Sequence, residues 1–375
     1  MRATNPVNRY TFLDWMRGLA VVIMIQCHTF NSFARVDVRS GGPYVLSQFI
    51  GGMAAPLFLF MAGMTFGFQM ESLERREPSA LRRWLFALKR AGYILAIAFA
   101  FRISNWIASL PRPELAEIFK VDILNSMGFG MAAFAALAML GARDRVRFAL
   151  AGGLIAAALA PIVANLNWTG VPVIVQDYLA AGTNPGRFPF FPYAAYIGFG
   201  LAAGMTVKRT EPPSLDRLMQ WCAIIGFIAI FGAQYFSNIP FSIYSKVDFW
   251  RNSPALVLIR SGVSLAMLVG AYLWTTYAAA PRWSWMQALG KTSLLVYWVH
   301  IMLVYGDIVK RFKRALPVSE TVLAVCIVIA LMVALAAVRL AWSDRRKEKR
   351  SLDRRRTPAE VPTGSLGGTV VTRTH

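Results

Sequence analysis

The stretch FLDWMRGLAVVIMIQCHTFNSF at residues 12–33 decides what kind of protein this is. It is long enough to cross a bilayer as a helix, which takes about 20 mostly apolar residues. It nevertheless contains Asp14, Arg17 and His28, and a charge at mid-depth costs at least about 2.5–3.5 kcal/mol on insertion scales. Ionisable residues inside a span point to function by default. The stretch therefore predicts a membrane helix that forms part of a functional site.

The rest of the chain has the composition of a membrane protein. Of its 375 residues, 56% are hydrophobic and 16% are charged. In soluble proteins roughly 45–50% of the residues are apolar and about 25% are charged. We therefore expect an all-α polytopic integral membrane protein with about ten transmembrane helices. The expected spans are, approximately, residues 12–33, 46–68, 91–110, 122–140, 148–165, 188–207, 218–238, 254–279, 290–309 and 320–342.

The charge balance fits a membrane protein better than a nucleic-acid-binding one. The chain has 40 Lys and Arg against 19 Asp and Glu, a formal net charge of +21. Most of these cations lie in short segments between apolar blocks and in the tail after Ser343, where they set orientation and meet anionic lipid. No basic soluble domain is visible that would bind nucleic acid. We therefore expect membrane lipids, and no nucleic acid, as partners.

The expected spans also predict an orientation. An even number of spans puts both termini on one side, and the basic tail places that side in the cytoplasm, at a bacterial inner (plasma) membrane. The cations of residues 310–314 depart from this rule, because their loop then faces outward. We expect residues 1–342 to form the transmembrane domain and residues 343–375 a basic, disordered cytoplasmic tail.

Three polar residues share one face of the first span. At about 100° per residue, Asp14 and Arg17 lie one turn apart, and Arg17 and His28 come within roughly 20° of each other. His28 lies roughly 16 Å deeper than Arg17. Two structural alternatives stay open: an ion pair at the inner interface for Asp14 and Arg17, and a packed imidazole bonded to a neighbouring helix for His28.

Other deep polar residues fall at a similar depth. The residues of this layer are His28, His300, Arg102 and Arg260. In the assigned topology all four lie roughly 7–14 Å below the outer surface. A shared polar cavity would explain this, since each group then solvates the others. Asp122 and Asn125 could cap that cavity, although a plain helix N-cap explains Asp122 equally well.

Such a cavity allows two kinds of chemistry. Histidines and arginines can deprotonate a weak nucleophile and stabilise an oxyanion, which are the two demands of acyl transfer. They can equally relay protons in a transporter or flippase of a polar lipid or glycan. A purely structural membrane subunit gives no reason for the alignment of Asp14, Arg17 and His28.

Four stretches resemble one family of membrane enzymes. LDWMRGLA at residues 13–20, followed by His28, is similar to the first-helix signature of type-3 integral-membrane acyltransferases. LGKTSLLVYWVH at 289–300 resembles the late-helix motif of the same superfamily. APLFLFMAG at 55–63 and VDILNSMG at 121–128 look closer to the branch that contains heparan-alpha-glucosaminide N-acetyltransferase and its bacterial relatives.

The resemblance implies transfer of an acyl group, expected to be acetyl, from cytoplasmic acyl-CoA to a hydroxyl or amine of a glycan or glycolipid. It makes His28 the essential histidine and general base, with His300 or Arg102 steadying the oxyanion. A route through an acyl-histidine stays open. Phosphates of acyl-CoA would lie near Arg17 and the basic loop 75–90. The residues expected to bind acyl-CoA are Asp14, Arg17 and Arg260. We expect no permanently bound cofactor and no metal.

Overall fold

The computed structural model describes residues 10–108, 114–181, 186–278 and 283–356, and within them the fold is helical without any strand. The α-helices are α1 (Thr11–Phe33), α2 (Gly42–Gly51), α3 (Ala54–Glu74), α4 (Ala80–Ala108), α5 (Ile123–Phe134), α6 (Ala142–Ala164), α7 (Val173–Leu179), α8 (Phe190–Arg209), α9 (Leu215–Ser237), α10 (Pro254–Leu273), α11 (Trp285–Lys291), α12 (Ser293–Tyr305) and α13 (Val318–Arg356). The short 3₁₀ helices are η1 (Val36–Val38), η2 (Leu115–Phe119), η3 (Ala135–Met139), η4 (Pro212–Ser214) and η6 (Asp307–Phe312), and η5 (Trp274–Ala278) is a π-helix. The expected all-α class is confirmed.

The helices have the length and hydropathy of membrane spans. Within the described residues, 7 helices are long and apolar enough to cross a bilayer, or up to 8 if the bent pair α11 and α12 counts as one span. The protein is therefore an integral membrane protein. All ten expected spans lie on helices, but two of these helices are not among the candidate spans. The helix formed by α5 and η3 is apolar but shorter, and polar residues lower the mean hydropathy of α1.

Helix breaks lie within or beside two of the expected spans. The block 46–68 contains a short turn at Gly52 between α2 and α3, although Gly42–Glu74 still qualifies as one span. The block 290–309 contains α12, and a bend of 89° after Lys291 separates α12 from α11, most of which lies before the block. The Ser284 side chain accepts a hydrogen bond from the backbone of Gln287 and so begins α11 as a separate helix. The polar run Lys291-Thr292-Ser293 marks the place of this bend, but the sequence alone does not give its angle.

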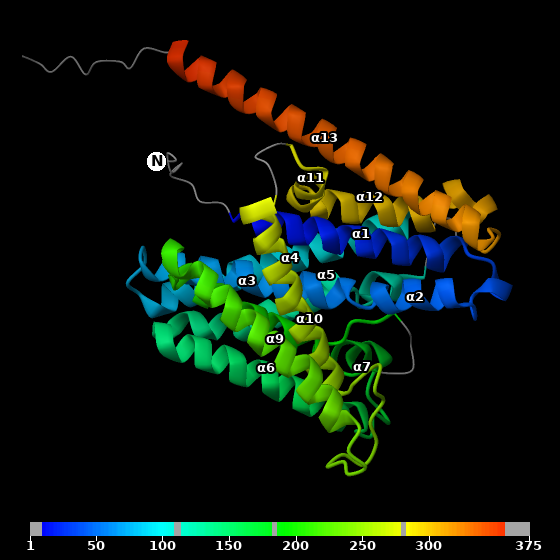
Figure 1. Ribbon diagram of the computed structural model, residues 1–375, viewed down its shortest axis with the longest axis horizontal. Helices are drawn as coiled ribbons and strands as arrows, with labels where there is room; N and C mark the ends of the chain where they lie inside the picture. Colours follow the sequence, from blue (N-terminus) through cyan, green and yellow to red (C-terminus); the bar gives the residue numbers. More distant parts are fainter. Residues whose placement is uncertain (1–9, 109–113, 182–185, 279–282, 357–375) are drawn as a thin grey trace, which may run out of the picture.

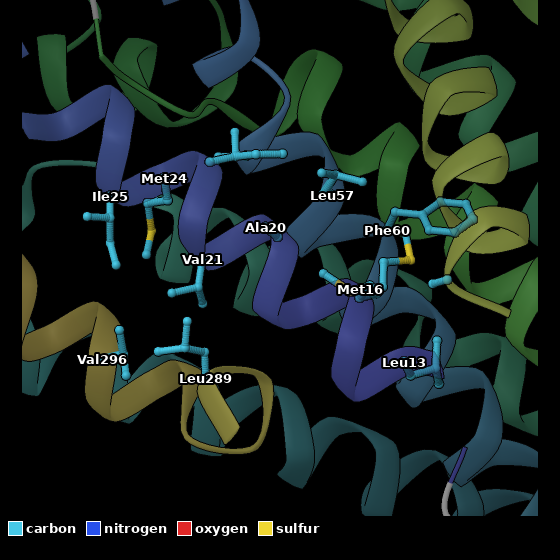
Figure 2. Packing of buried hydrophobic residues seen from close by; sticks show 14 of the residues in the cluster. Leu13, Met16, Ala20, Val21, Met24, Ile25, Leu57, Phe60, Leu289 and Val296 are labelled. Atoms are coloured by element: carbon cyan, nitrogen blue, oxygen red, sulfur yellow. The ribbon is translucent and has the colours of Figure 1, made fainter. Parts of the chain in front are cut away.

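Helix α1 lies at the centre of one of the two apolar clusters of the bundle. Met16, Ala20 and Val21 are fully buried along it, and they belong to the same cluster as Leu57 of α3 and Leu289 of α11 (Figure 2). Helices α3, α11, α12 and α13 all pack against α1 (Figure 1). The polar face of α1 is therefore held inside the bundle rather than in lipid.

Glycines allow α1 and α11 to approach each other closely. A Cβ atom at Gly290 would fall on the backbone oxygen of Asp14, and one at Gly18 would fall on the backbone oxygen of Met286. Small residues at helix crossings have this role in membrane proteins, where van der Waals packing drives association. The contact places the start of α12 beside α1.

An ion cluster joins α3, α6 and α8, and the sequence did not predict it. Arg145 is fully buried and donates to Glu71 at 2.9 Å, and it also pairs with Glu74 at 2.9 Å. Arg209 donates from Nε to the same Glu71 carboxylate at 2.8 Å. The cluster lies at the helix ends opposite to the His28 end of α1, because α3 and α8 end there and α6 begins there.

The C-terminal segment differs from its expectation. We expected disorder from residue 343, but α13 continues without a break to Arg356. This expectation was wrong for residues 343–356, because a helix that leaves the membrane is continued by helix-forming Arg, Lys, Glu and Leu residues. Residues 357–375 lie outside the described part of the chain.

The close contact at Gly290 is testable. Gly290→Ala should lower the free energy of unfolding by about 1–3 kcal/mol, because the added carbon overlaps the backbone of α1. Thermal unfolding of the detergent-solubilised protein measures this. Gly92→Ala is the matched control, since a Cβ atom at Gly92 of α4 meets nothing within 4 Å. Equal melting temperatures of the two variants would contradict the proposed packing.

Candidate active site

The two intramembrane histidines meet. Nδ1 of His28 on α1 lies 3.0 Å from Nε2 of His300 on α12, which is hydrogen-bonding distance. Their rings are nearly parallel, with centroids 5.3 Å apart and planes 5° apart. His300 is fully buried, and His28 is half-buried. Residues 272 positions apart in sequence thus form one pair.

The hydrogen bonds of the pair determine its tautomers. Nδ1 of His300 lies 2.9 Å from the backbone oxygen of Val296, and a carbonyl oxygen can only accept, so this nitrogen carries the proton. In the neutral imidazole of His300, Nε2 is then the acceptor, and Nδ1–H of His28 donates to it. Nε2 of His28 is left with its lone pair. The arrangement therefore prepares His28 to accept a proton.

Tyrosines flank the pair on two sides. Tyr297 lies one turn before His300, with ring centroids 5.9 Å apart. Tyr305 lies edge-on to His28, with centroids 5.6 Å apart, and its hydroxyl accepts a hydrogen bond from the amide of Asn31 at 3.3 Å. Asn31 and Tyr305 are exposed and His28 is half-buried, so the protein surface lies close to His28 on this side.

Arg17 and Asp14 form a pair at the other end of α1. Nη1 of Arg17 lies 3.6 Å from Oδ1 of the buried Asp14, so the structural ion pair considered from sequence is present. Arg17 also lines a cavity of about 220 Å³ between α1, α3, α4, α5 and α12. Arg90, Ser293 and Tyr297 line the same cavity. The cavity therefore links two cations near one end of α1 to the neighbour of His300.

Arg102 is committed to another partner. Its Nε donates to the backbone oxygen of Glu117 at 2.8 Å, and its Nη2 lies 2.8 Å from the Glu117 carboxylate. Partial burial raises the pKa of Glu117, but the charges of Lys120 and Arg102 outweigh it and hold this pKa below its usual value. Within the described residues no hydrogen bond joins Arg102 to either imidazole. Arg102 therefore makes its direct contacts with Glu117, although it also interacts electrostatically with Tyr297, the neighbour of His300, and its catalytic role stays a prediction.

Arg260 is also separate from the Arg17 cavity. It interacts electrostatically with Tyr193 and Tyr196 of α8, and a Cβ atom added at Gly52, between α2 and α3, would meet its Nη2. It does not line the cavity that Arg17 and Arg90 share. The predicted group of Asp14, Arg17 and Arg260 is thus divided between two places.

Asp122 is the N-cap of α5, one of the two roles that the sequence allowed for it. The Asp122 side chain accepts from the backbone N–H groups of Leu124 and Asn125, and the Asn125 side chain accepts from the backbone of Asp122. This reciprocal capping box begins α5.

Sequence reasoning included Arg90 in the basic segment 75–90 but expected a loop there, whereas α4 begins at Ala80 and carries Arg90 on a helix against the cavity. It missed Tyr305 beside His28. Tyr305 lies in the apolar block of His300, where an aromatic residue looks like ordinary packing.

Within the described residues, no group of three or more His, Cys, Asp or Glu side chains could hold a metal ion.

Comparison with known proteins identifies the family. A family described as an acyltransferase domain, of the type-3 acyltransferases, matches residues 10–338, which is nearly the whole chain. No curated protein matches the sequence. The narrower likeness to the heparan-alpha-glucosaminide N-acetyltransferase branch stays a prediction. The family decides between the two chemistries that the deep polar residues allowed, acyl transfer and transport. The chain belongs to the type-3 acyltransferase family and is a membrane acyltransferase.

Proposed function

We propose that the protein transfers an acyl group, acetyl in the simplest case, from acyl-CoA to a hydroxyl or amine of a glycan or glycolipid, with His28 as the general base. The observation that carries this proposal is the His28–His300 hydrogen bond of 3.0 Å, which leaves a lone pair on Nε2 of His28. A half-buried imidazole with that lone pair suits proton abstraction from a weak nucleophile.

The proposed reaction is a direct displacement. Nε2 of His28 takes the proton from the acceptor as its oxygen or nitrogen forms a bond to the thioester carbonyl carbon. The carbon–sulfur bond then breaks, and the CoA thiolate leaves with the proton from the His28 imidazolium. No other reactant is required.

His300 acts in this scheme as a positioning residue. Its Nε2 accepts from Nδ1–H of His28 and so holds the base in one tautomer and one orientation. The backbone carbonyl of Val296 in turn orients His300. The arrangement has the logic of a catalytic triad, in which a third group orients the base. The Tyr297 hydroxyl, in the cavity beside His300, is the donor we propose for the developing oxyanion.

The donor is proposed to bind in the Arg17 cavity. Guanidinium groups of Arg17 and Arg90 provide cations for the CoA phosphates, and Tyr297 lies where the thioester would reach the histidine pair. The position of Arg17, roughly 16 Å along α1 from His28, separates phosphate binding from chemistry. Cytoplasmic acyl-CoA then requires that the Arg17 end of α1, and with it both termini, face the cytoplasm of a bacterial inner membrane.

His28→Ala should reduce acyl transfer by about 10²–10⁴-fold, because general-base catalysis contributes that much. The measurement is transfer of radiolabelled acetyl from acetyl-CoA to membrane glycans by purified protein in liposomes. Cys27→Ala is the matched control, since the neighbouring Cys27 faces Gln48 at 3.5 Å rather than the pair. Undiminished transfer by His28→Ala would remove His28 from its role.

His300→Ala should lower kcat while leaving the KM for acetyl-CoA unchanged, because the donor cavity is intact and only the orientation of His28 is lost. Imidazole added to the assay should restore part of the rate by occupying the vacated space. A purely structural role of His300 would show no such rescue and would instead lower the melting temperature.

Arg17→Gln and Arg90→Gln should each raise the KM for acetyl-CoA by about tenfold, the loss of one charge-assisted phosphate contact. The same variants should use acetyl-pantetheine, which lacks the phosphates, as well as the unsubstituted protein does. Arg82→Gln is the control, because the Arg82 side chain is 72% exposed and makes a 3.9 Å contact with Glu77. An equal loss with both donors would argue against phosphate binding.

A further inference from the structure

A basic surface surrounds the His28 end of α1, and the mechanism above does not use it. Two segments that are distant in sequence form it: residues 34–39 after α1 and residues 307–316 before α13. A backbone hydrogen bond from Arg35 to Leu316 joins the two segments, and one from Arg314 to Ser32 joins the second segment to the end of α1, both 2.9 Å. Figure 1 shows the end of α1 and the start of α13 at the same end of the bundle. We call this surface the basic mouth, and its cations are Arg35, Arg39, Lys310, Arg311, Lys313 and Arg314.

Few carboxylates balance these cations. Arg35 is paired with Asp37 at 2.8 Å, and this hydrogen bond holds the pKa of Asp37 below its usual value. Lys313 lies 3.7 Å from Asp307. In the described part of the chain no ion pair engages the other four cations, which are Arg39, Lys310, Arg311 and Arg314. The basic mouth therefore carries an excess of positive charge.

The basic mouth is unusual in the side of the membrane that it faces and in the backbone conformation of Arg314. In the proposed topology the basic mouth faces away from the cytoplasm, on the side where membrane proteins carry fewer Lys and Arg residues. Arg314 also has a φ of 55°, a left-handed conformation that favours glycine. The backbone N–H of Arg314 donates to Ser32, which holds the segment in this conformation.

The basic mouth leads directly to His28. The Asn31 amide bonds to Tyr305, whose ring contacts His28, and the Tyr44 hydroxyl donates to the Asn31 side chain at 3.3 Å. Arg39 donates to the Asn31 backbone at 2.8 Å and lies over the Tyr44 ring at 5.5 Å. Tyrosine rings with polar tips beside an exposed amide suit a sugar ring, which has both apolar and hydroxyl surfaces.

We infer that the basic mouth binds the acceptor and selects a glycan that carries carboxylate or phosphate groups. This inference rests on the proposed function, because it places the acceptor hydroxyl at the open side of His28. Guanidinium and ammonium groups bind such anions, and a surface of one charge raises the local concentration of oppositely charged ligand. The tyrosines and Asn31 favour a glycan over a lipid headgroup as the source of the anion.

The test measures binding without turnover. Wild-type protein in phosphatidylcholine nanodiscs, with no acyl donor present, is titrated with fluorescent oligogalacturonate and with a neutral galactose oligomer of equal length. We expect binding of the acidic oligomer to be at least about tenfold tighter and to weaken as salt is added. Equal binding of the two oligomers, or binding of neither, would overturn the inference.

Substitutions in the basic mouth test where the preference for the acidic oligomer arises. Lys310→Gln combined with Arg311→Gln should abolish the preference for the acidic oligomer, because both side chains are exposed and neither belongs to the proposed catalytic groups. Lys246→Gln, in the loop between α9 and α10, is the control and should retain the preference. A preference that survives the double substitution would place the anion site elsewhere and contradict the inference.

Two further comparisons separate the remaining explanations. If phosphatidylglycerol in the nanodisc displaces the acidic oligomer, the basic mouth binds lipid headgroups, and the glycan assignment is wrong. Retained binding supports the glycan. Acetyl transfer from acetyl-CoA is measured on the same preparation, so a protein that binds the acidic oligomer but transfers nothing refutes the proposed function and not the anion preference.

Discussion

The hydrogen bond between His28 and His300 is the interaction on which the candidate active site depends. It joins the first helix of the family match to α12 and gives both imidazoles a partner inside the bundle. A buried polar group without a partner costs about 1–3 kcal/mol, so the pair satisfies a requirement of the fold as well as one of the chemistry. The same contact leaves Nε2 of His28 available.

Several features of the helices serve to place this bond. The 89° bend between α11 and α12 lets α11 cross α1 while α12 continues toward His28. The glycine contact at Gly290 allows that crossing. The Arg17 cavity and the exposed Asn31 then lie on opposite sides of the pair along α1, as the proposed approach of donor and acceptor from different ends requires.

The sequence predicted part of this architecture. Each of the ten apolar blocks lies on a helix, although within the described residues 7 helices, or up to 8 with the bent pair, are long and apolar enough to cross a bilayer. The similar depth of His28 and His300 indicated that they meet, because a span fixes the depth of its residues. Depth does not determine which side chains are neighbours in the plane of the membrane. Depth alone grouped Arg102 and Arg260 with the histidines, yet they face Glu117 and Tyr196. Helix order and bends decide lateral neighbours. The run Gly290-Lys291-Thr292-Ser293 marks an interruption of the apolar sequence, but it does not give the angle or the direction of the bend.

The tautomer of His28 finally depends on an atom that belongs to no side chain. The backbone oxygen of Val296 sets the proton on His300, and His300 sets the proton on His28. Every amino acid at position 296 supplies that oxygen, so point mutation there cannot delete it. A substitution at position 296 therefore leaves the tautomers of both histidines unchanged. Only a change in the path of α12 could reverse them.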